Sequence, residues 1–161
     1  TEDIALEEAV LKAMKEKGLT LSTAESCTGG YISHLITQYP GCSEVYQGGA
    51  VVYSNALKES ILGVKHETLF PYGAGNQETV IEMAKGAVEH FKIDIAVAVT
   101  GIAGPDGGTP DKPVGTVWIA VASKEKAVSR LFQYGSKRSQ NIERSASAAL
   151  TMILSVVRES F

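Results

Sequence analysis

The chain has 161 residues, 44% of them hydrophobic and 20% charged, so it is long enough to bury a core and too apolar for wholesale disorder. Fifteen Lys and Arg against eighteen Asp and Glu give a formal net charge of −3 with no basic run, which disfavours a nucleic-acid groove. We also expect no signal peptide and no membrane-spanning segment, and therefore a cytoplasmic protein.

The first part of the chain alternates between helical and strand patterns. The predicted elements here are helices over 2–17, 30–38 and 55–62 and strands over 19–24 and 45–53. Gly18 is placed to end the first helix, and Asn55 is a reasonable N-cap for the third.

The second part continues the same alternation. The predicted elements are helices over 76–91 and 139–159 and strands over 93–99, 116–122 and 127–134. The run IDIAVAV over 93–99 is nearly all apolar, as expected for a central strand covered on both faces, and the last two strands resemble a hairpin. Because helices and strands interleave without a linker, we predict one α/β domain over 1–161, a three-layer α/β/α sandwich with a mixed, largely parallel sheet.

Polar and glycine-rich segments follow three of these strands, where open α/β sheets usually place their sites. The first is TAESCTGG over 23–30. The small residues Thr28, Gly29 and Gly30 let a ligand approach the backbone, and the N–H groups of a helix start suit an anion or a developing oxyanion. Ser26 is a candidate nucleophile here, with the alternative that Ser26 or Thr28 only caps the helix.

The second segment, GAVVYSNALK over 49–58, ends at Lys58. A lysine on a short helix is normally a solvated surface charge. A nucleophilic serine needs a base, however, and the sequence offers no convincing Ser-His-Asp arrangement, whereas a lysine desolvated enough to be neutral can do the same work. Tyr53 is either a core aromatic residue or a proton donor.

The third segment is the glycine-rich stretch TGIAGPDGGTPDKPVGT over 100–116. It is either a loop that encloses a ligand, with Thr100, Gly101, Ala103 and Gly104 as contacts, or a flexible turn. It matches neither the phosphate-binding loop nor the dinucleotide fingerprint. The two cysteines and three scattered histidines show no metal-ligand spacing, so we expect no metal.

The runs AESCTGG, GGAVVYSN with Lys58 beyond it, and TGIAGPDGGTPDKPVGTV, in this order, closely resemble the CinA C-terminal domain family. The resemblance covers nearly the whole chain. The characterised enzymes of this family are nicotinamide-nucleotide amidohydrolases. The resemblance therefore implies a Ser/Lys amidohydrolase that converts nicotinamide mononucleotide to nicotinate mononucleotide and ammonia in pyridine-nucleotide (NAD) recycling, without a metal or organic cofactor.

The resemblance also implies individual roles. The family's serine, tyrosine and lysine fall on Ser26, Tyr53 and Lys58, which makes these the expected catalytic residues. Thr100 matches the polar residue that opens the family's GIAGP loop. Arg138 occupies a basic position ahead of the last helix and is a candidate for binding the substrate phosphate. Backbone N–H groups within 27–30 are the expected oxyanion donors.

The chain departs from the family pattern in one loop. Members commonly read Gly-Ala-Val-Ser before the middle helix, whereas here Gly73-Ala74 are followed by Gly75-Asn76; Asn76 can still act as an N-cap. Larger members carry a separate N-terminal domain, so we expect this chain to be the single-domain version and a homo-oligomer, with a dimer as one option. Two alternatives stay open: a catalytically silent sensor that binds a pyridine nucleotide, and a protein-interaction module.

Overall fold

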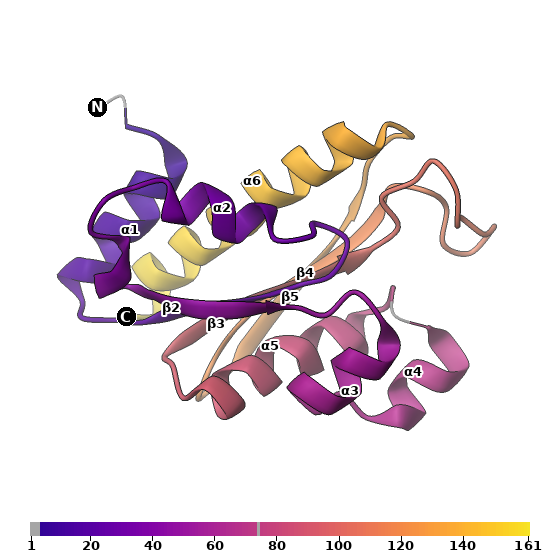
Figure 1. Cartoon of the computed structure of the whole chain (residues 1–161), viewed down its shortest axis with the longest axis horizontal. Coiled ribbons are helices and arrows are strands. Elements are labelled where there is room, and N and C mark those ends of the chain that lie inside the picture. Colours follow the sequence, from indigo (N-terminus) through magenta and orange to yellow (C-terminus); the bar gives the residue numbers. More distant parts are fainter. Residues whose placement is uncertain (1–3, 74) are drawn as a thin grey trace.

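The computed structural model describes residues 4–73 and 75–161, which form a sheet between two layers of helices (Figure 1). The strands are β1 (Leu21–Glu25), β2 (Tyr46–Val51), β3 (Ile95–Gly101), β4 (Thr116–Ser123) and β5 (Ala127–Gln133). The helices are α1 (Leu6–Glu16), α2 (Tyr31–Thr37), α3 (Asn55–Leu62), α4 (His66–Tyr72), α5 (Gln77–Phe91) and α6 (Arg138–Ser160), with a 3₁₀ turn over Cys42–Glu44.

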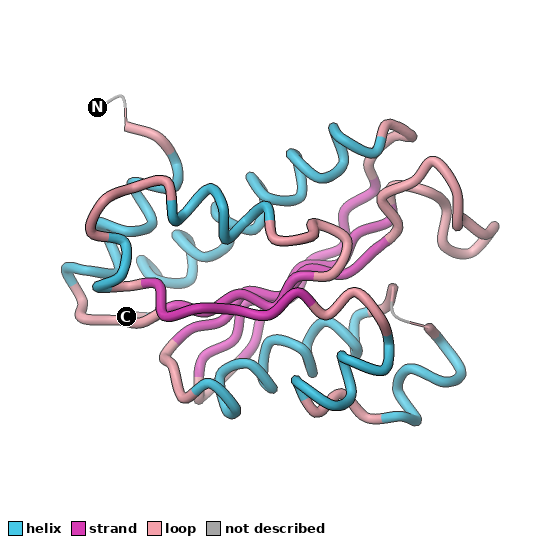
Figure 2. Tube along the Cα trace, viewed as in Figure 1, coloured by secondary structure: helices cyan, strands magenta, loops and turns pink. Residues whose placement is uncertain are grey.

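The five-stranded sheet has the order β2-β1-β3-β4-β5. β1 lies parallel to both β2 and β3, and β4 and β5 add to the other side as an antiparallel hairpin. Helices α1, α2 and α6 cover one face, and α3, α4 and α5 cover the other (Figures 1 and 2). The predicted α/β/α sandwich with a mixed sheet and a central third strand is therefore confirmed.

The two faces of the sheet bury side chains of different size. Along β3, Ile95, Val97 and Val99 pack into the cluster that includes α1, α2 and α6, while Ala96 and Ala98 pack against α5. Side chains alternate between the faces of a strand, so one run of sequence supplies both layers. The alanines allow α5 to lie close to the sheet.

Helix α3, which carries Lys58, is held against α5 by a close approach at Gly86. A Cβ atom at Gly86 would lie 1.9 Å from the Leu62 carbonyl oxygen, so only glycine fits there. Ser54 caps α3 by accepting a hydrogen bond from the Leu57 N–H at 3.1 Å. The prediction of Asn55 as the cap was therefore wrong by one residue, because the serine already has the extended backbone that a cap requires.

The other differences from the predicted elements are small shifts at the ends of helices and strands and one additional helix. Helix α1 begins at Leu6, since Ala5 is extended, and residues 2 and 3 of the predicted helix lie outside the described residues. Asn76 caps α5 as predicted, accepting from the Thr79 N–H at 2.9 Å. Helix α4 was not predicted, because it is short and contains a proline. Within the described ranges, no helix is long and apolar enough to cross a membrane.

Candidate active site

Three strand ends meet at one edge of the sheet. Ser26 directly follows β1, Tyr53 follows β2, and Thr100 lies buried near the end of β3. Because these three strands are parallel neighbours, their carboxyl ends point the same way and bring together segments that are distant in sequence. The predicted site segments therefore share one edge of the molecule.

Lys58 and Ser26 form a buried pair at this edge. The Lys58 Nζ atom lies 3.0 Å from Ser26 Oγ, 2.8 Å from the Val52 carbonyl oxygen and 3.0 Å from the Tyr53 carbonyl oxygen. The Lys58 side chain is only 1% exposed and Ser26 only 6%. Lys58 is thus not a solvated surface charge, although it lies on a short helix.

Burial changes the charge state of this lysine. It lowers the pKa of Lys58 from 10.5 to about 8, against a smaller raising effect of the neighbouring Cys27 thiol. The polar contacts of the amine come from main-chain carbonyls and one hydroxyl, with no carboxylate among its hydrogen-bond partners in the described chain. The neutral amine is therefore accessible close to physiological pH.

The turn after Ser26 leaves few backbone donors available. The Gly29 N–H donates to the Ser26 carbonyl oxygen at 3.0 Å, and the Gly30 N–H donates to Glu25 Oε1 at 3.2 Å. No hydrogen bond from the Cys27 or Thr28 N–H to another described residue is present. Of the four N–H groups predicted as oxyanion donors, those of Cys27 and Thr28 are therefore the two available to a ligand.

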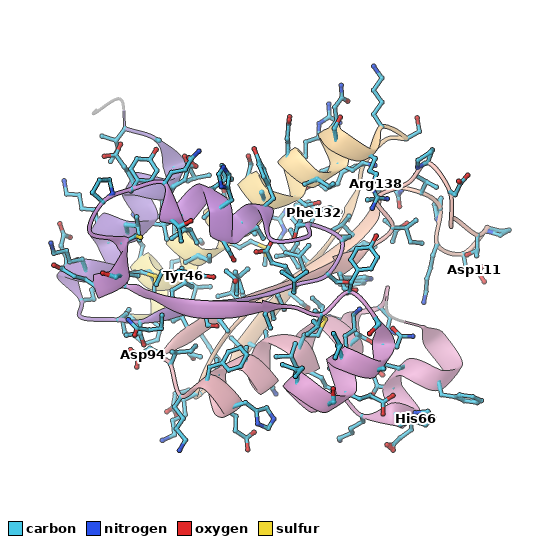
Figure 3. The ribbon with its side chains drawn as sticks, in the orientation of Figure 1. Tyr46, His66, Asp94, Asp111, Phe132 and Arg138 are labelled. Carbon is cyan, nitrogen blue, oxygen red and sulfur yellow. The ribbon has the colours of Figure 1, made fainter. Side chains whose placement is uncertain are left out.

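Tyr53 lies on the surface of the site. Its side chain is 58% exposed, so the alternative that it is a core aromatic residue is wrong. Its hydroxyl accepts a hydrogen bond from Arg138 Nη2 at 2.9 Å, and Arg138 Nη1 donates to the Gly104 carbonyl oxygen at 2.7 Å. Arg138 thus links the segment after β2 to the glycine-rich loop, at the end of the molecule where Figure 3 also shows Asp111.

The start of the glycine-rich loop is attached to the first turns of α6. Asn141 Nδ2 donates to the Ala103 and Gly135 carbonyl oxygens, at 2.9 Å in each case. Arg138 holds the next residue, Gly104. Gly101 fits close to β4, where a Cβ atom would lie 2.4 Å from the Thr116 carbonyl oxygen. This part of the loop is fixed, so of the two interpretations made from sequence the flexible turn does not apply to it.

Two buried side chains at the site, Asn141 and Glu25, were not predicted from the sequence. Asn141 carries no motif, and its spacing three residues after Arg138 is its only signal. Glu25 is the only charged residue in β1 and directly precedes Ser26, which is a signal that could have been read. The altered loop at 73–76 is described in part: a Cβ atom at Gly75 would lie 3.8 Å from the Lys112 side chain, and Ala74 is outside the described residues.

A cavity of about 820 Å³ lies elsewhere, at the opposite end of the sheet. Lysines and carboxylates from α5 and the β4–β5 turn line it, and none of the site residues above does. No group of three or more His, Cys, Asp or Glu side chains within 4–73 and 75–161 is arranged to hold a metal ion. We therefore place the candidate site at the Ser26–Lys58 pair and not at this cavity.

Similarity to known proteins shows the family of the chain. The family model described as CinA C-terminal domain matches residues 3–157. A CinA-like protein of Amoebophilus asiaticus is 47% identical over 148 residues, which cover 92% of this chain and 36% of the relative. A CinA-like protein of Thermotoga neapolitana is 46% identical over 157 residues, covering 98% of this chain and 38% of the relative. The chain thus spans well under half the length of these curated relatives.

Solved structures show the same fold over almost the whole chain. The competence/damage inducible protein CihA from Agrobacterium tumefaciens superposes with a TM-score of 0.91 at 38% identity, covering 96% of both chains. The competence damage-inducible protein A from Klebsiella pneumoniae gives a TM-score of 0.93 at 30% identity, covering 97% of both. On the family match and these likenesses, the chain belongs to the CinA C-terminal domain family.

Proposed function

We propose that this chain hydrolyses the carboxamide of nicotinamide mononucleotide to nicotinate mononucleotide and ammonia, with Ser26 as nucleophile and Lys58 as general base. The observation that carries the proposal is the setting of the Lys58 amine. Two of its neighbours, the Val52 and Tyr53 carbonyl oxygens, can only accept hydrogen bonds. A neutral amine has two N–H bonds for these carbonyls, and its lone pair then faces Ser26 Oγ.

The lowered pKa supports the same role. With a pKa of about 8, about a tenth of Lys58 is neutral at pH 7. At the ordinary value the neutral fraction would be roughly three in ten thousand. Burial therefore raises the concentration of the competent base by about two orders of magnitude, and the two carbonyls stabilise the ammonium ion once the proton has moved.

The reaction proceeds as two acyl transfers. The neutral amine of Lys58 takes the Ser26 proton as Oγ bonds to the carboxamide carbon, and the oxyanion forms beside the N–H groups of Cys27 and Thr28. The carbon–nitrogen bond then breaks, the nitrogen takes up the proton and ammonia leaves. Water attacks the acyl ester, Lys58 accepts its proton, and the acid departs as Ser26 regains its hydrogen.

The exposed pair Tyr53 and Arg138 supports recognition of a phosphorylated substrate. The Arg138 guanidinium is bound to a phenol and a carbonyl, both neutral, and phosphate is a stronger acceptor than either. We expect the substrate phosphate to replace Tyr53 on Arg138. The released hydroxyl can then help to deliver a proton to the departing ammonia.

The proposed setting is the cytoplasm, with the chain acting as a homo-oligomer. Both cysteines, Cys27 and Cys42, are free thiols, which suits a reducing compartment. Nucleic acid and membrane are not among the proposed partners.

The test is to incubate the purified protein with nicotinamide mononucleotide and to measure ammonia together with nicotinate mononucleotide. We expect the wild-type protein to release ammonia and nicotinate mononucleotide in equal amounts, and Ser26→Ala to release neither. Binding of the nucleotide without turnover would identify a sensor instead. Neither binding nor turnover would favour the interaction module.

A further inference from the structure

The proposed mechanism leaves one buried carboxylate without a role. Glu25 is 0% exposed, and both of its carboxylate oxygens accept hydrogen bonds. Oε1 accepts from Thr28 Oγ1 at 2.7 Å, from the Gly30 N–H at 3.2 Å and from the Ile32 N–H at 3.0 Å. Oε2 accepts from the Ser33 N–H at 3.0 Å and from Ser33 Oγ at 2.7 Å. A buried carboxylate is tolerated only when it is satisfied in this way.

These bonds replace an ordinary helix cap. The N-cap of α2 is Gly30, which has no side chain to accept from the first turn. The N–H groups of Ile32 and Ser33, which a cap would satisfy, donate to Glu25 instead. Glu25 lies on the strand side of the turn, so one side chain joins the end of β1 to the start of α2 across the residues between them. Ser26 is the first of those residues.

The strand side of the turn is already fixed by the sheet. The Ser26 N–H donates to the Val99 carbonyl oxygen at 3.0 Å, and the Glu25 carbonyl oxygen accepts from the Val52 N–H at 2.8 Å. The helix side has no such ladder. Two backbone bonds hold the turn itself, from the Gly29 N–H to the Ser26 carbonyl oxygen and from the Tyr31 N–H to the Thr28 carbonyl oxygen, and the side-chain bonds converge on the Glu25 carboxylate.

We propose that Glu25 is a positioning residue for the nucleophile: its carboxylate holds the turn over 26–30 in the one arrangement that keeps Ser26 Oγ on the Lys58 amine and the Thr28 N–H beside it. The inference rests on the proposed role of Ser26 as nucleophile. Glu25 acts through this geometry and touches neither substrate nor the Lys58 amine.

An electrostatic role is the main alternative, and the charges at the site disfavour it. The Glu25 charge contributes to raising the pKa of the adjacent Cys27 thiol, after the larger effect of burial. Burial lowers the pKa of Lys58 against a smaller raising effect of Cys27, and Glu25 is not among the causes of that shift. Removing the Glu25 charge should therefore leave the pKa of Lys58 unchanged.

The test measures the reactivity of Ser26 directly, with a small organophosphorus fluoride that phosphonylates nucleophilic serines and needs no nucleotide pocket. In Glu25→Gln the single remaining oxygen can serve the turn or Ser33 but not both. In Thr28→Val only the bond from the Thr28 hydroxyl to Glu25 is lost, and the bonds from the Gly30, Ile32 and Ser33 N–H groups remain. This variant therefore still tests the proposal if Glu25→Gln does not fold. The control is Asp94→Asn, the same chemical change at the opposite end of β1 (Figure 3), where Asp94 Oδ2 accepts from the Thr20 N–H at 2.8 Å.

We expect the plateau rate of Ser26 labelling to fall by about 30-fold in Glu25→Gln and about tenfold in Thr28→Val, measured on folded protein, because small displacements of a nucleophile are costly. The pH midpoint of labelling should stay within half a unit of the wild-type value, and Asp94→Asn should label like wild type. Plateau rates within threefold of wild type in both variants would reduce Glu25 to a helix cap. A midpoint that moves by more than half a unit would make its role electrostatic and overturn the inference.

If the proposed function is wrong, the wild-type protein itself will give a different result from the one expected. A wild-type protein that is labelled at Ser26 but releases no ammonia from nicotinamide mononucleotide would lack the proposed activity, and the labelling rates would still test Glu25. A wild-type protein that shows neither labelling nor turnover would remove the nucleophile itself, and the role of Glu25 with it.

Discussion

The candidate site has a buried half and an exposed half, and the two are held by different means. In the buried half, Lys58 is 1% exposed and its amine contacts two main-chain carbonyls and Ser26 Oγ. In the exposed half, Tyr53 is 58% exposed and accepts a hydrogen bond from Arg138, which also donates to the Gly104 carbonyl oxygen of the loop. The backbone fixes the first pair, whereas the second pair is held by side-chain bonds at the surface.

This difference indicates a division of labour. A base must be desolvated to lose its proton at neutral pH and must not move, and both needs are met by burial against the backbone. A group that binds a charged ligand must exchange its partners when the ligand arrives, which requires access to solvent. Substitutions in the buried half should therefore act on kcat, and those in the exposed half mainly on KM.

The largest effect is expected for Ser26→Ala. It removes the nucleophile, so we expect kcat for deamidation to fall by about 10⁴-fold or more while the nucleotide still binds. Ser22→Ala is the matched control, because Ser22 is a buried serine of β1, the strand that Ser26 follows, and donates to the Gly48 carbonyl oxygen at 2.7 Å. It should lose about 1 kcal/mol of stability and keep its turnover. Comparable turnover in the two variants would remove Ser26 from the mechanism.

The next effect concerns the protonation of Lys58. Lys58→Arg and Lys58→Ala should both lower kcat by about 10³-fold, because an arginine keeps the charge but does not give up its proton. In the wild type, the pKa is lowered to about 8 and the neutral form is the base, so kcat/KM should rise with pH and level off above that value. Lys85→Arg, a change at an exposed position of α5, serves as the control. Substantial activity in Lys58→Arg would show that the residue supplies only positive charge.

The exposed half should respond through KM. Arg138→Ala removes a charge-assisted contact with the phosphate, which should raise KM for nicotinamide mononucleotide by about 10- to 100-fold. The corresponding riboside, which lacks the phosphate, should be affected little. Lys137→Ala, at the neighbouring exposed cation, should change KM by less than about threefold. An equal loss for the nucleotide and the riboside would mean that Arg138 acts on Tyr53 or the loop and does not bind phosphate.

The sequence predicted the fold well because local patterns determine it. The apolar run before Thr100 and the alternation of helices and strands were sufficient to predict the sandwich. The contact between Ser26 and Lys58, 32 positions apart, was inferred only from the resemblance. The number of residues between two segments does not tell how far apart they lie in the folded chain. The bond between Tyr53 and Arg138, 85 positions apart, depends on tertiary packing and had no signal in the sequence.

The smallest effect is expected for Cys27, although it adjoins Ser26 and thiols are the better nucleophiles. Burial raises the pKa of Cys27 to about 12, so at pH 7 only about one thiol in 10⁵ is ionised, against a few in a hundred for an ordinary thiol. Its side chain belongs to the core that packs under α2 and α6, where it acts as a small hydrophobic residue.

Cys27→Ala should therefore keep turnover within about threefold of wild type and cost about 1 kcal/mol of stability through the space it leaves. Iodoacetamide at pH 7 should modify the partly exposed Cys42 before Cys27, without loss of activity. Cys42→Ala isolates the reaction at Cys27, and the measurement is the rate of inactivation with and without nucleotide. Rapid inactivation that the nucleotide prevents, together with an inactive Cys27→Ala, would transfer the role of nucleophile from Ser26 to the thiol. Slow inactivation is expected, because the same burial that lowers the pKa of Lys58 keeps this neighbouring thiol protonated.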